Sequence, residues 1–124
     1  MFDYKLLVSA LIFVIIDSFY LQLMKNYFEN QIKIVQNSPM KINIIGILSC
    51  YIFLILGLNY FIIKQNRSIN DAFLFGLVIY GVFETTNYAI FKNWSLISVI
   101  IDTLWGGILF ASTTYLTKLF FGKL

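Results

Sequence analysis

Four long apolar runs alternate with short polar segments along the chain. None of the runs shows the period-two alternation that is typical of a half-buried strand. Each is close to the roughly 20 residues that a helix needs to cross a bilayer, and backbone groups in a bilayer must be paired within helices or a closed barrel. The pattern predicts an all-α, membrane-spanning four-helix bundle with up-down-up-down order, in one domain over residues 1–124. The predicted spans cover residues 4–24, 42–63, 71–91 and 94–119.

Residues 25–41 form the longest polar stretch between two spans. A short amphipathic helix at the membrane interface and a simple polar loop both fit this stretch. Either one should end near Pro39, because proline disfavours helix in the residue before it. As a helix, the stretch carries apolar side chains on one face and polar ones on the other, namely Phe28, Ile32 and Val35 against Lys25, Glu29, Lys33 and Gln36.

Local signals refine the spans. The first run is long and contains an acid, Asp17, which favours a retained helix over a cleaved signal peptide. Asn70 or Asp71 is expected to cap the helix of the third span. In the fourth span, small residues four apart permit close contact with a neighbouring helix; they are Thr103, Gly107 and Ala111.

Composition excludes most soluble classes of protein. Apolar residues make up 60% of the chain and charged residues 12%, whereas an average soluble domain has about 45–50% and about 25%. A single cysteine, Cys50, excludes an intrachain disulfide and a CxxC metal site. The chain has no histidine, which is the commonest base and metal ligand at neutral pH. We therefore expect no cofactor and no metal.

The net charge of +3 comes from basic residues that are spread singly, without the basic patch of a nucleic-acid-binding protein. We therefore expect a lipid bilayer, and no nucleic acid, as the partner. With four crossings, both termini lie on one side of the membrane. An excess of one basic residue on that side favours cytoplasmic termini. The side of the termini carries Lys5, Lys64, Arg67, Lys118 and Lys123, and the other side carries Lys25, Lys33, Lys41 and Lys92.

Three acids lie inside the predicted spans: Asp17, Glu84 and Asp102. A charged side chain at the centre of a spanning helix costs about 2.5–3.5 kcal/mol, and no lysine or arginine lies deep in any span. Counting residues at 1.5 Å each from the span ends puts all three acids in one layer, somewhat beyond the midplane. If their helices face one another, the acids form one cluster. At least one carboxyl is then expected to be protonated at neutral pH, because burial and neighbouring like charges disfavour the ionised form.

Polar side chains accompany each of these acids. Tyr80 and Asn87 share a helix face with Glu84, and aromatic residues lie one turn after each of the two aspartates. Phenol, amide and indole groups can all hydrogen-bond a carboxyl without carrying charge. The sequence therefore predicts a substrate- or ion-binding site formed by Asp17, Glu84, Asp102, Tyr20, Tyr80, Asn87 and Trp105.

Two segments of the chain resemble each other. Residues 14–20 read Val-Ile-Ile-Asp-Ser-Phe-Tyr, and residues 99–105 read Val-Ile-Ile-Asp-Thr-Leu-Trp. An internal repeat would explain the likeness. Transporter repeats recur in chain order, however, whereas the pattern in this chain is mirrored, and strings rich in isoleucine and phenylalanine match easily by chance. A chance match is therefore the favoured explanation, and the repeat is the alternative.

These features support three kinds of function. The first is binding or conduction of a proton, cation or small polar substrate inside the bundle or a homo-oligomer. The second is a structural or helper role, in which the acids form a hydrogen-bond network between helices or pair with a partner protein. The third is a membrane-embedded enzyme acting on lipids. It is disfavoured, because no nucleophile–base pair is visible and no catalytic residue is predicted.

Several short motifs resemble those of a known family of small integral-membrane proteins. They are residues 17–21 (Asp-Ser-Phe-Tyr-Leu), 56–61 (Leu-Gly-Leu-Asn-Tyr-Phe), 76–80 (Gly-Leu-Val-Ile-Tyr), 84–87 (Glu-Thr-Thr-Asn) and 102–106 (Asp-Thr-Leu-Trp-Gly). The family is domain-of-unknown-function family 2177 (DUF2177), and the resemblance covers nearly all of the chain. It implies a four-helix membrane protein, picks out the same acids and implies no activity.

The chain departs from that family's pattern at two positions. Glu84 stands where the family usually has aspartate, and Ser95 follows Trp94 where the family usually has proline. The longer side chain of Glu84 would displace the ligand oxygens of a geometry-sensitive site. This difference argues against a metal centre at the acids.

Overall fold

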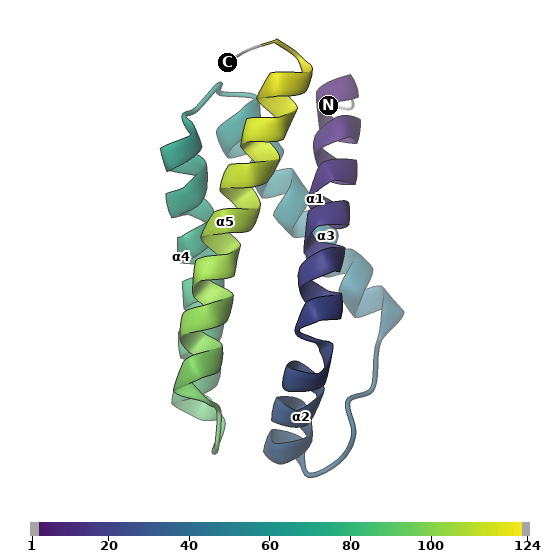
Figure 1. Ribbon diagram of the computed structural model, residues 1–124, viewed down its shortest axis with the longest axis vertical. Coiled ribbons are helices and arrows are strands. Elements are labelled where there is room, and N and C mark those ends of the chain that lie inside the picture. Colours follow the sequence, from purple (N-terminus) through teal and green to yellow (C-terminus); the bar gives the residue numbers. More distant parts are fainter. Residues whose placement is uncertain (1–2, 123–124) are drawn as a thin grey trace.

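The computed structural model describes residues 3–122, and within this range it contains helices and no strand. Within this range, four long apolar rods make up the bundle. The rods alternate in direction, and the start of α1 lies at the same end of the bundle as the end of α5 (Figure 1). The all-α four-helix bundle is therefore confirmed. Its elements are α1 (Tyr4–Leu23), α2 (Lys25–Gln36), α3 (Ile44–Gly57), the π-helical η1 (Leu58–Ile63), α4 (Ile69–Ile90) and α5 (Leu96–Phe120).

Side-chain caps set where the helices begin. The Ser68 hydroxyl accepts a hydrogen bond from the Asp71 backbone N–H at 3.0 Å, so α4 begins at Ile69. The prediction that Asn70 or Asp71 would cap this helix was therefore wrong, because the serine before them provides the acceptor. Ser95 caps α5 in the same way.

Residues 25–36 form a helix rather than a simple loop. Helix α2 ends where Asn37 adopts a left-handed conformation with φ of 62°, just before Pro39, as the sequence predicted. The helix lies at the end of the bundle opposite the termini (Figure 1). Phe28 and Ile32 are half-buried, whereas the most buried side chain of α2 is the polar Gln31.

The helices are apolar outside and partly polar inside. Four stretches, counting α3 with η1 as one, are long and apolar enough to cross a membrane. Large apolar side chains such as Phe53, which is 73% exposed, point outward, whereas Ser9 and Thr113 are fully buried. An outward apolar surface of this extent is stable only against lipid or another apolar surface.

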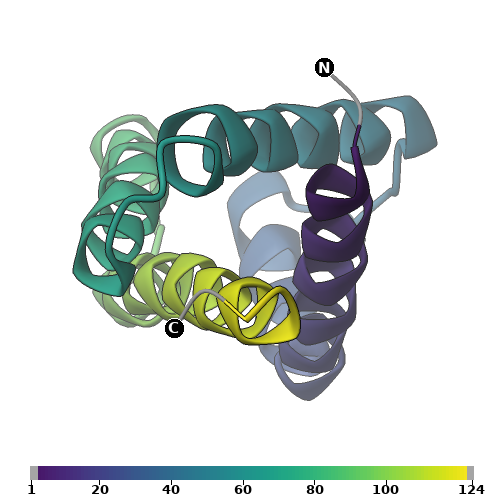
Figure 2. The same ribbon diagram turned by 90° about the horizontal axis from the view of Figure 1, so that it is seen from above.

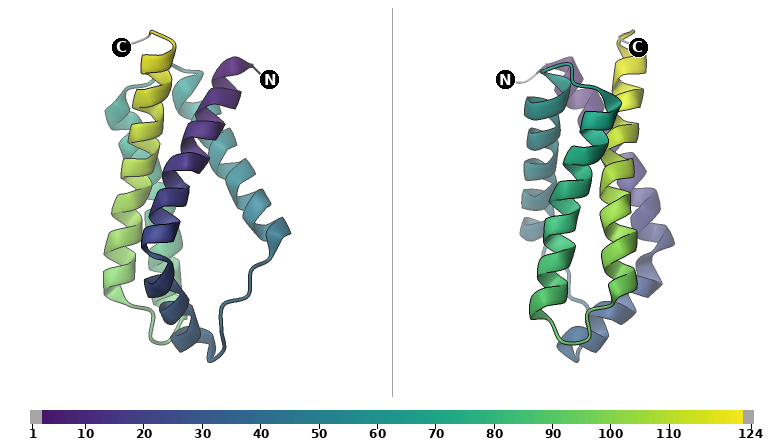
Figure 3. Two further views of the ribbon diagram at one scale, coloured as in Figure 1. Left: turned by 45° about the vertical axis from the view of Figure 1, so that its right-hand side comes forward. Right: turned by 90° about the vertical axis from the view of Figure 1, so that its left-hand side faces the viewer.

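Helix α3 is the least packed of the four rods. Its N-terminal half leans away from the other helices (Figure 3), and residues 43–50 are all exposed. Viewed from above, the α3–η1 rod forms one side of a four-sided arrangement with α1, α5 and α4 (Figure 2). Packing is restored in η1, where Leu58 is fully buried. The tighter half of this rod thus lies near the termini.

Helices α4 and α5 form the closest pair, because glycines let their backbones approach. A Cβ atom on Gly76 would collide with the Gly106 carbonyl oxygen and would lie 2.8 Å from Phe110. A Cβ atom on Gly106 would collide with the Tyr80 ring, and one on Gly107 would lie 2.7 Å from Phe73. Small residues at helix contacts are the usual route to tight packing in lipid.

This contact predicts that Gly76→Ala destabilises the protein. The added methyl group meets backbone, which cannot rotate away, and overpacking of this kind costs about 1–3 kcal/mol. Thermal unfolding in detergent should show a lower midpoint for Gly76→Ala. Gly46→Ala is the matched control, since its Cβ would meet only Asn43 atoms at 3.8 Å or more; an unchanged midpoint for both variants would contradict the packing account.

Candidate functional site

The three acids of the spans lie in the interior of the bundle. Glu84 is 1% exposed and Asp17 is 7% exposed, while Asp102 is half-buried. The carboxyls of Glu84 and Asp102 are within hydrogen-bonding reach of each other. The structure thus brings an acid of α4 and an acid of α5 into direct contact.

Two reciprocal hydrogen bonds join α1 and α5. In each of them, an aromatic side chain of one helix donates to an aspartate of the other. The Tyr20 hydroxyl donates to Asp102 Oδ1 at 3.0 Å. The Trp105 indole N–H donates to Asp17 Oδ1 at 2.9 Å. The two donor rings stack on each other, with centroids 4.4 Å apart and planes inclined by 3°. Each aspartate therefore bonds the aromatic residue that lies one turn from the other aspartate.

This exchange sets the height of Asp17 relative to the acid pair. Tyr20 lies one turn from Asp17 in the direction away from the termini, and it reaches Asp102. Asp17 is therefore about one helical turn, roughly 5 Å, nearer the termini than Asp102. The sequence placed all three carboxyls in one layer, whereas the structure arranges them as two steps.

Two aromatic donors complete the site, and the sequence analysis missed both. The Tyr51 hydroxyl, from α3, donates to Asp17 Oδ2 at 2.6 Å. The Trp94 indole N–H, from the connection between α4 and α5, donates to Glu84 Oε1 at 2.9 Å. Tyr51 lies in the middle of its span, where a polar tip has no water to bind, and that position was the available signal.

Tyr80 and Asn87, the remaining predicted site residues, lie beside the cluster. Tyr80 packs its ring against Gly106 and against Phe110, with ring centroids 6.4 Å apart in the second case. Asn87 is buried near Glu84 on α4. No hydrogen bond joins either side chain to one of the three carboxyls within residues 3–122.

Neutral groups alone surround the acids. Within the part of the chain that the structure describes, the single ion pair joins Arg67 and Asp71 at 3.8 Å, on the surface. No three acids or cysteines of residues 3–122 are grouped so as to hold a metal ion. Ionised carboxylates repel each other, whereas a protonated carboxyl donates a hydrogen bond to its neighbour. The Glu84–Asp102 contact is therefore suited to hold one shared proton.

A second polar cluster joins α2 to the start of α5. Gln31 Oε1 accepts from the Ser95 backbone N–H at 3.0 Å and from the Ser98 hydroxyl at 2.9 Å. Its amide nitrogen donates to the Asn93 carbonyl at 3.1 Å. The Tyr27 hydroxyl lies 3.0 Å from Ser98 Oγ. These contacts hold α2 across the end of the bundle opposite the termini.

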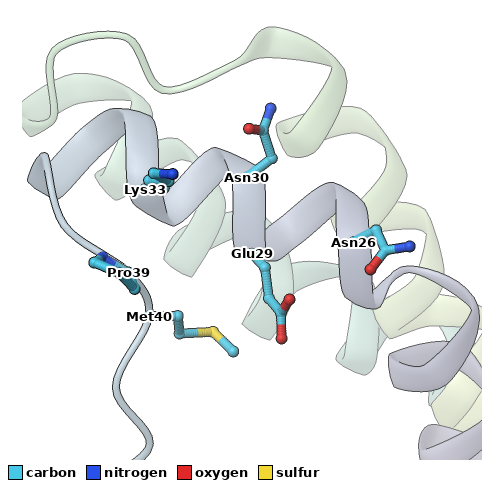
Figure 4. A pocket seen from close by; sticks show the side chains of 6 residues that line it. All are labelled: Asn26, Glu29, Asn30, Lys33, Pro39 and Met40. Atoms are coloured by element: carbon cyan, nitrogen blue, oxygen red, sulfur yellow. The ribbon is translucent and has the colours of Figure 1, made fainter.

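The opposite face of α2 borders an open pocket of about 400 Å³. Glu29 and Met40 both point into the space between α2 and the segment that follows it (Figure 4). Asn26, Asn30, Lys33 and Pro39 complete the lining. None of the three buried acids lines this pocket, so it is separate from the carboxyl cluster.

The network predicts that removing one hydroxyl donor weakens the bundle. Tyr20→Phe and Tyr51→Phe each delete an interhelical hydrogen bond, and such bonds in membranes contribute about 0.6–2 kcal/mol. Unfolding in detergent, followed by circular dichroism, should show lower stability for both variants. Tyr60→Phe is the control because its side chain is 52% exposed; equal stability of all three variants would show that the network contributes nothing to the fold.

Comparison with known proteins agrees with this architecture. A family model described as "Predicted membrane protein (DUF2177)" matches residues 4–119. No curated protein and no solved structure matches the chain. With its four apolar helices, the protein is a multi-pass membrane protein that sits in a lipid bilayer. Because the family model covers almost the whole sequence, the chain belongs to the DUF2177 family of predicted membrane proteins.

Proposed function

We propose that this membrane protein binds an exchangeable proton at Glu84 and Asp102, and that Asp17 serves as the next proton acceptor. The observation that carries the proposal is the contact between the two carboxyls in the bundle interior. No basic side chain within residues 3–122 neutralises this pair. A shared proton is the simplest charge that stabilises two carboxyls in such a place.

The donors around the acids favour a proton over a larger cation. A metal cation is bound by several oxygen atoms that offer lone pairs. Here, indole N–H groups of Trp94 and Trp105 point at Glu84 and Asp17, and an indole N–H has no lone pair to offer. These groups instead stabilise the carboxylate that remains after a proton leaves.

Tyr20 provides a further proton-carrying group at the height of the acid pair. Its hydroxyl donates to Asp102 and can accept a proton while donating one, as phenols do. Its ring stacks on Trp105, which bonds Asp17. The site thus offers proton-carrying side chains at two heights of the bundle. Two heights are useful for moving a proton, whereas a contact that only packs two helices together needs one.

A structural or helper role is the second candidate, and one observation favours it. Hydrogen bonds to the acids join α1, α3, α5 and the α4–α5 connection, so the network also ties the helices together. A helper protein would use the acids for this purpose alone. Proton movement and stability must therefore be measured on the same variants.

Proton flux into vesicles tests the proposal. The protein is reconstituted into vesicles that contain a pH-sensitive dye, and a potassium diffusion potential drives protons inward. We expect flux above that of protein-free vesicles for the natural chain, and loss of this excess when Asp17→Asn, Glu84→Gln and Asp102→Asn are combined, because amides cannot exchange a proton in this way.

The control is Asp71→Asn, which removes an exposed acid in the first turn of α4 and should leave the flux unchanged. Equal flux from the natural chain and the triple variant would rule the proposal out. If the triple variant then also unfolds at a lower temperature, the structural role is the better account.

We also propose that both termini face the cytoplasm. The count from the sequence favours this orientation by one basic residue. It assigns five to the side of the termini, Lys5, Lys64, Arg67, Lys118 and Lys123, and four to the other side. A reporter that is active only in the cytoplasm, fused after residue 124, should be active in cells. Activity only of a reporter that works outside the cytoplasm would reverse the orientation.

A further inference from the structure

Two pairs of hydrogen-bonded side chains show that α1 and the α3–η1 rod stay in register over two turns. Asp17 bonds Tyr51 near the middle of the bundle. Eight residues from each of them, in the direction of the termini, Ser9 Oγ lies 3.1 Å from Asn59 Oδ1. Eight residues span about 12 Å along a helix, a little over two turns. The interior between these rods is therefore built in layers.

Helix α5 follows the same register. Trp105 bonds Asp17, and at the end of the bundle Thr117 lines a small cavity together with Lys5. Thr113 lies eight residues from the first of these α5 positions and four from the second. It therefore lies at the height of Ser9 and Asn59, and we call these three residues the hydroxyl layer.

One hydroxyl of the hydroxyl layer lacks a partner among the described residues. Ser9 and Thr113 are both fully buried. Thr113 Oγ1 has no hydrogen-bond partner within residues 3–122, whereas Thr117 donates to a carbonyl of its own helix at 2.7 Å. Ser9 Oγ lies 3.1 Å from the Leu6 carbonyl and equally far from Asn59 Oδ1, so these two acceptors share its one hydrogen. The layer thus contains one hydroxyl without a partner, and an amide oxygen whose two lone pairs leave room for a second donor.

A cavity of about 20 Å³ lies one turn outside the hydroxyl layer, at the end of the bundle that carries the termini. A space of this size holds about one water molecule. The π-helical turn η1 borders the same region, and such turns are frequent at functional sites. The cavity is lined by Lys5, Ile63, Asn66, Thr117, Lys118 and Phe121.

An apolar layer separates the hydroxyl layer from the acids. Phe13, Leu109 and Phe110 are all fully buried. The rings of Phe13 and Phe110 meet edge to face, with centroids 5.4 Å apart. Phe13 lies one turn from Ser9 and one turn from Asp17, which are themselves about 12 Å apart along α1. The three side chains of this layer carry no polar group, and the rings of Tyr51 and Tyr80 pack against them.

We propose that the hydroxyl layer binds water and forms the inner end of a narrow water route from the terminus-bearing surface, closed by the apolar layer. A water molecule can accept from Thr113 and donate to Asn59 Oδ1, whose second lone pair is available beside Ser9. The last step rests on the proposed function: a proton passes between this water and Asp17 only when the rings of Phe13 and Phe110 move apart.

Thiol hydrogen exchange tests the water route. In a Cys50→Ala background, which removes the natural thiol, Thr113→Cys and Ser9→Cys each place one S–H group in the hydroxyl layer. Ser112→Cys is the size-matched control, because Ser112 is partly exposed on the lipid side at the same depth. Vesicles are transferred to D2O, and infrared spectroscopy follows the S–H band.

We expect loss of the S–H band for Thr113→Cys within a time at which the Ser112→Cys band persists. Ser9→Cys should behave like Thr113→Cys, and it decides the question if the latter variant does not fold. Bands of the hydroxyl layer that persist as long as that of the control would overturn the route.

The apolar layer is tested separately by proton flux. Phe13→Ala should raise the flux severalfold, whereas Phe13→Leu, which keeps the layer filled, should leave it near that of the natural chain. Unchanged flux in folded Phe13→Ala would overturn the gate. If the thiols exchange but flux does not depend on the acids, the proposed function fails and the water route stands. If flux depends on the acids and the thiols do not exchange, the water route fails and the proposed function stands.

Discussion

Reciprocal hydrogen bonding between α1 and α5 is the constraint on which the interior of this protein depends. Asp17 takes its donor from Trp105, and Asp102 takes its donor from Tyr20, so neither helix can slide along the other without breaking both bonds. In lipid no water replaces a lost partner, and a slip would leave two carboxyls without donors. The stacked rings fill the space between the two bonds. Register, and with it the layers above the acids, follows from this exchange.

The bilayer explains why polar groups gather inside. Lipid is as apolar as leucine, so burying an apolar side chain between helices gains little, and close packing and hydrogen bonds hold the helices together. Glycines bring α4 against α5, which places Glu84 beside Asp102. The N-terminal half of α3 has few contacts, because it contains neither a glycine that packs against another helix nor a buried polar side chain.

The polar interior is divided by height. A hydroxyl layer lies near the termini, an apolar layer of phenylalanines follows, then the carboxyls, and finally the Gln31 cluster that holds α2 across the far end. An arrangement intended only to join helices could place its hydrogen bonds at any height. Phe13 lies one turn from Ser9 and one turn from Asp17, and the proposed proton passage uses this separation between the hydroxyl layer and the carboxyls.

The sequence by itself determined the number of spanning helices, their approximate ends and which acids lie inside the spans, because the length of an apolar run and the cost of a charge in lipid are local quantities. Only the tertiary structure decided which groups meet. Tyr51 and Trp94 were missed, and Tyr20 and Trp105 bond the opposite aspartates from those one turn away. The structure also shows that the two similar segments, residues 14–20 and 99–105, face each other and are joined by the two reciprocal hydrogen bonds. Partner choice depends on how far one helix is shifted along and rotated about its neighbour, and no periodicity within a single helix records that shift.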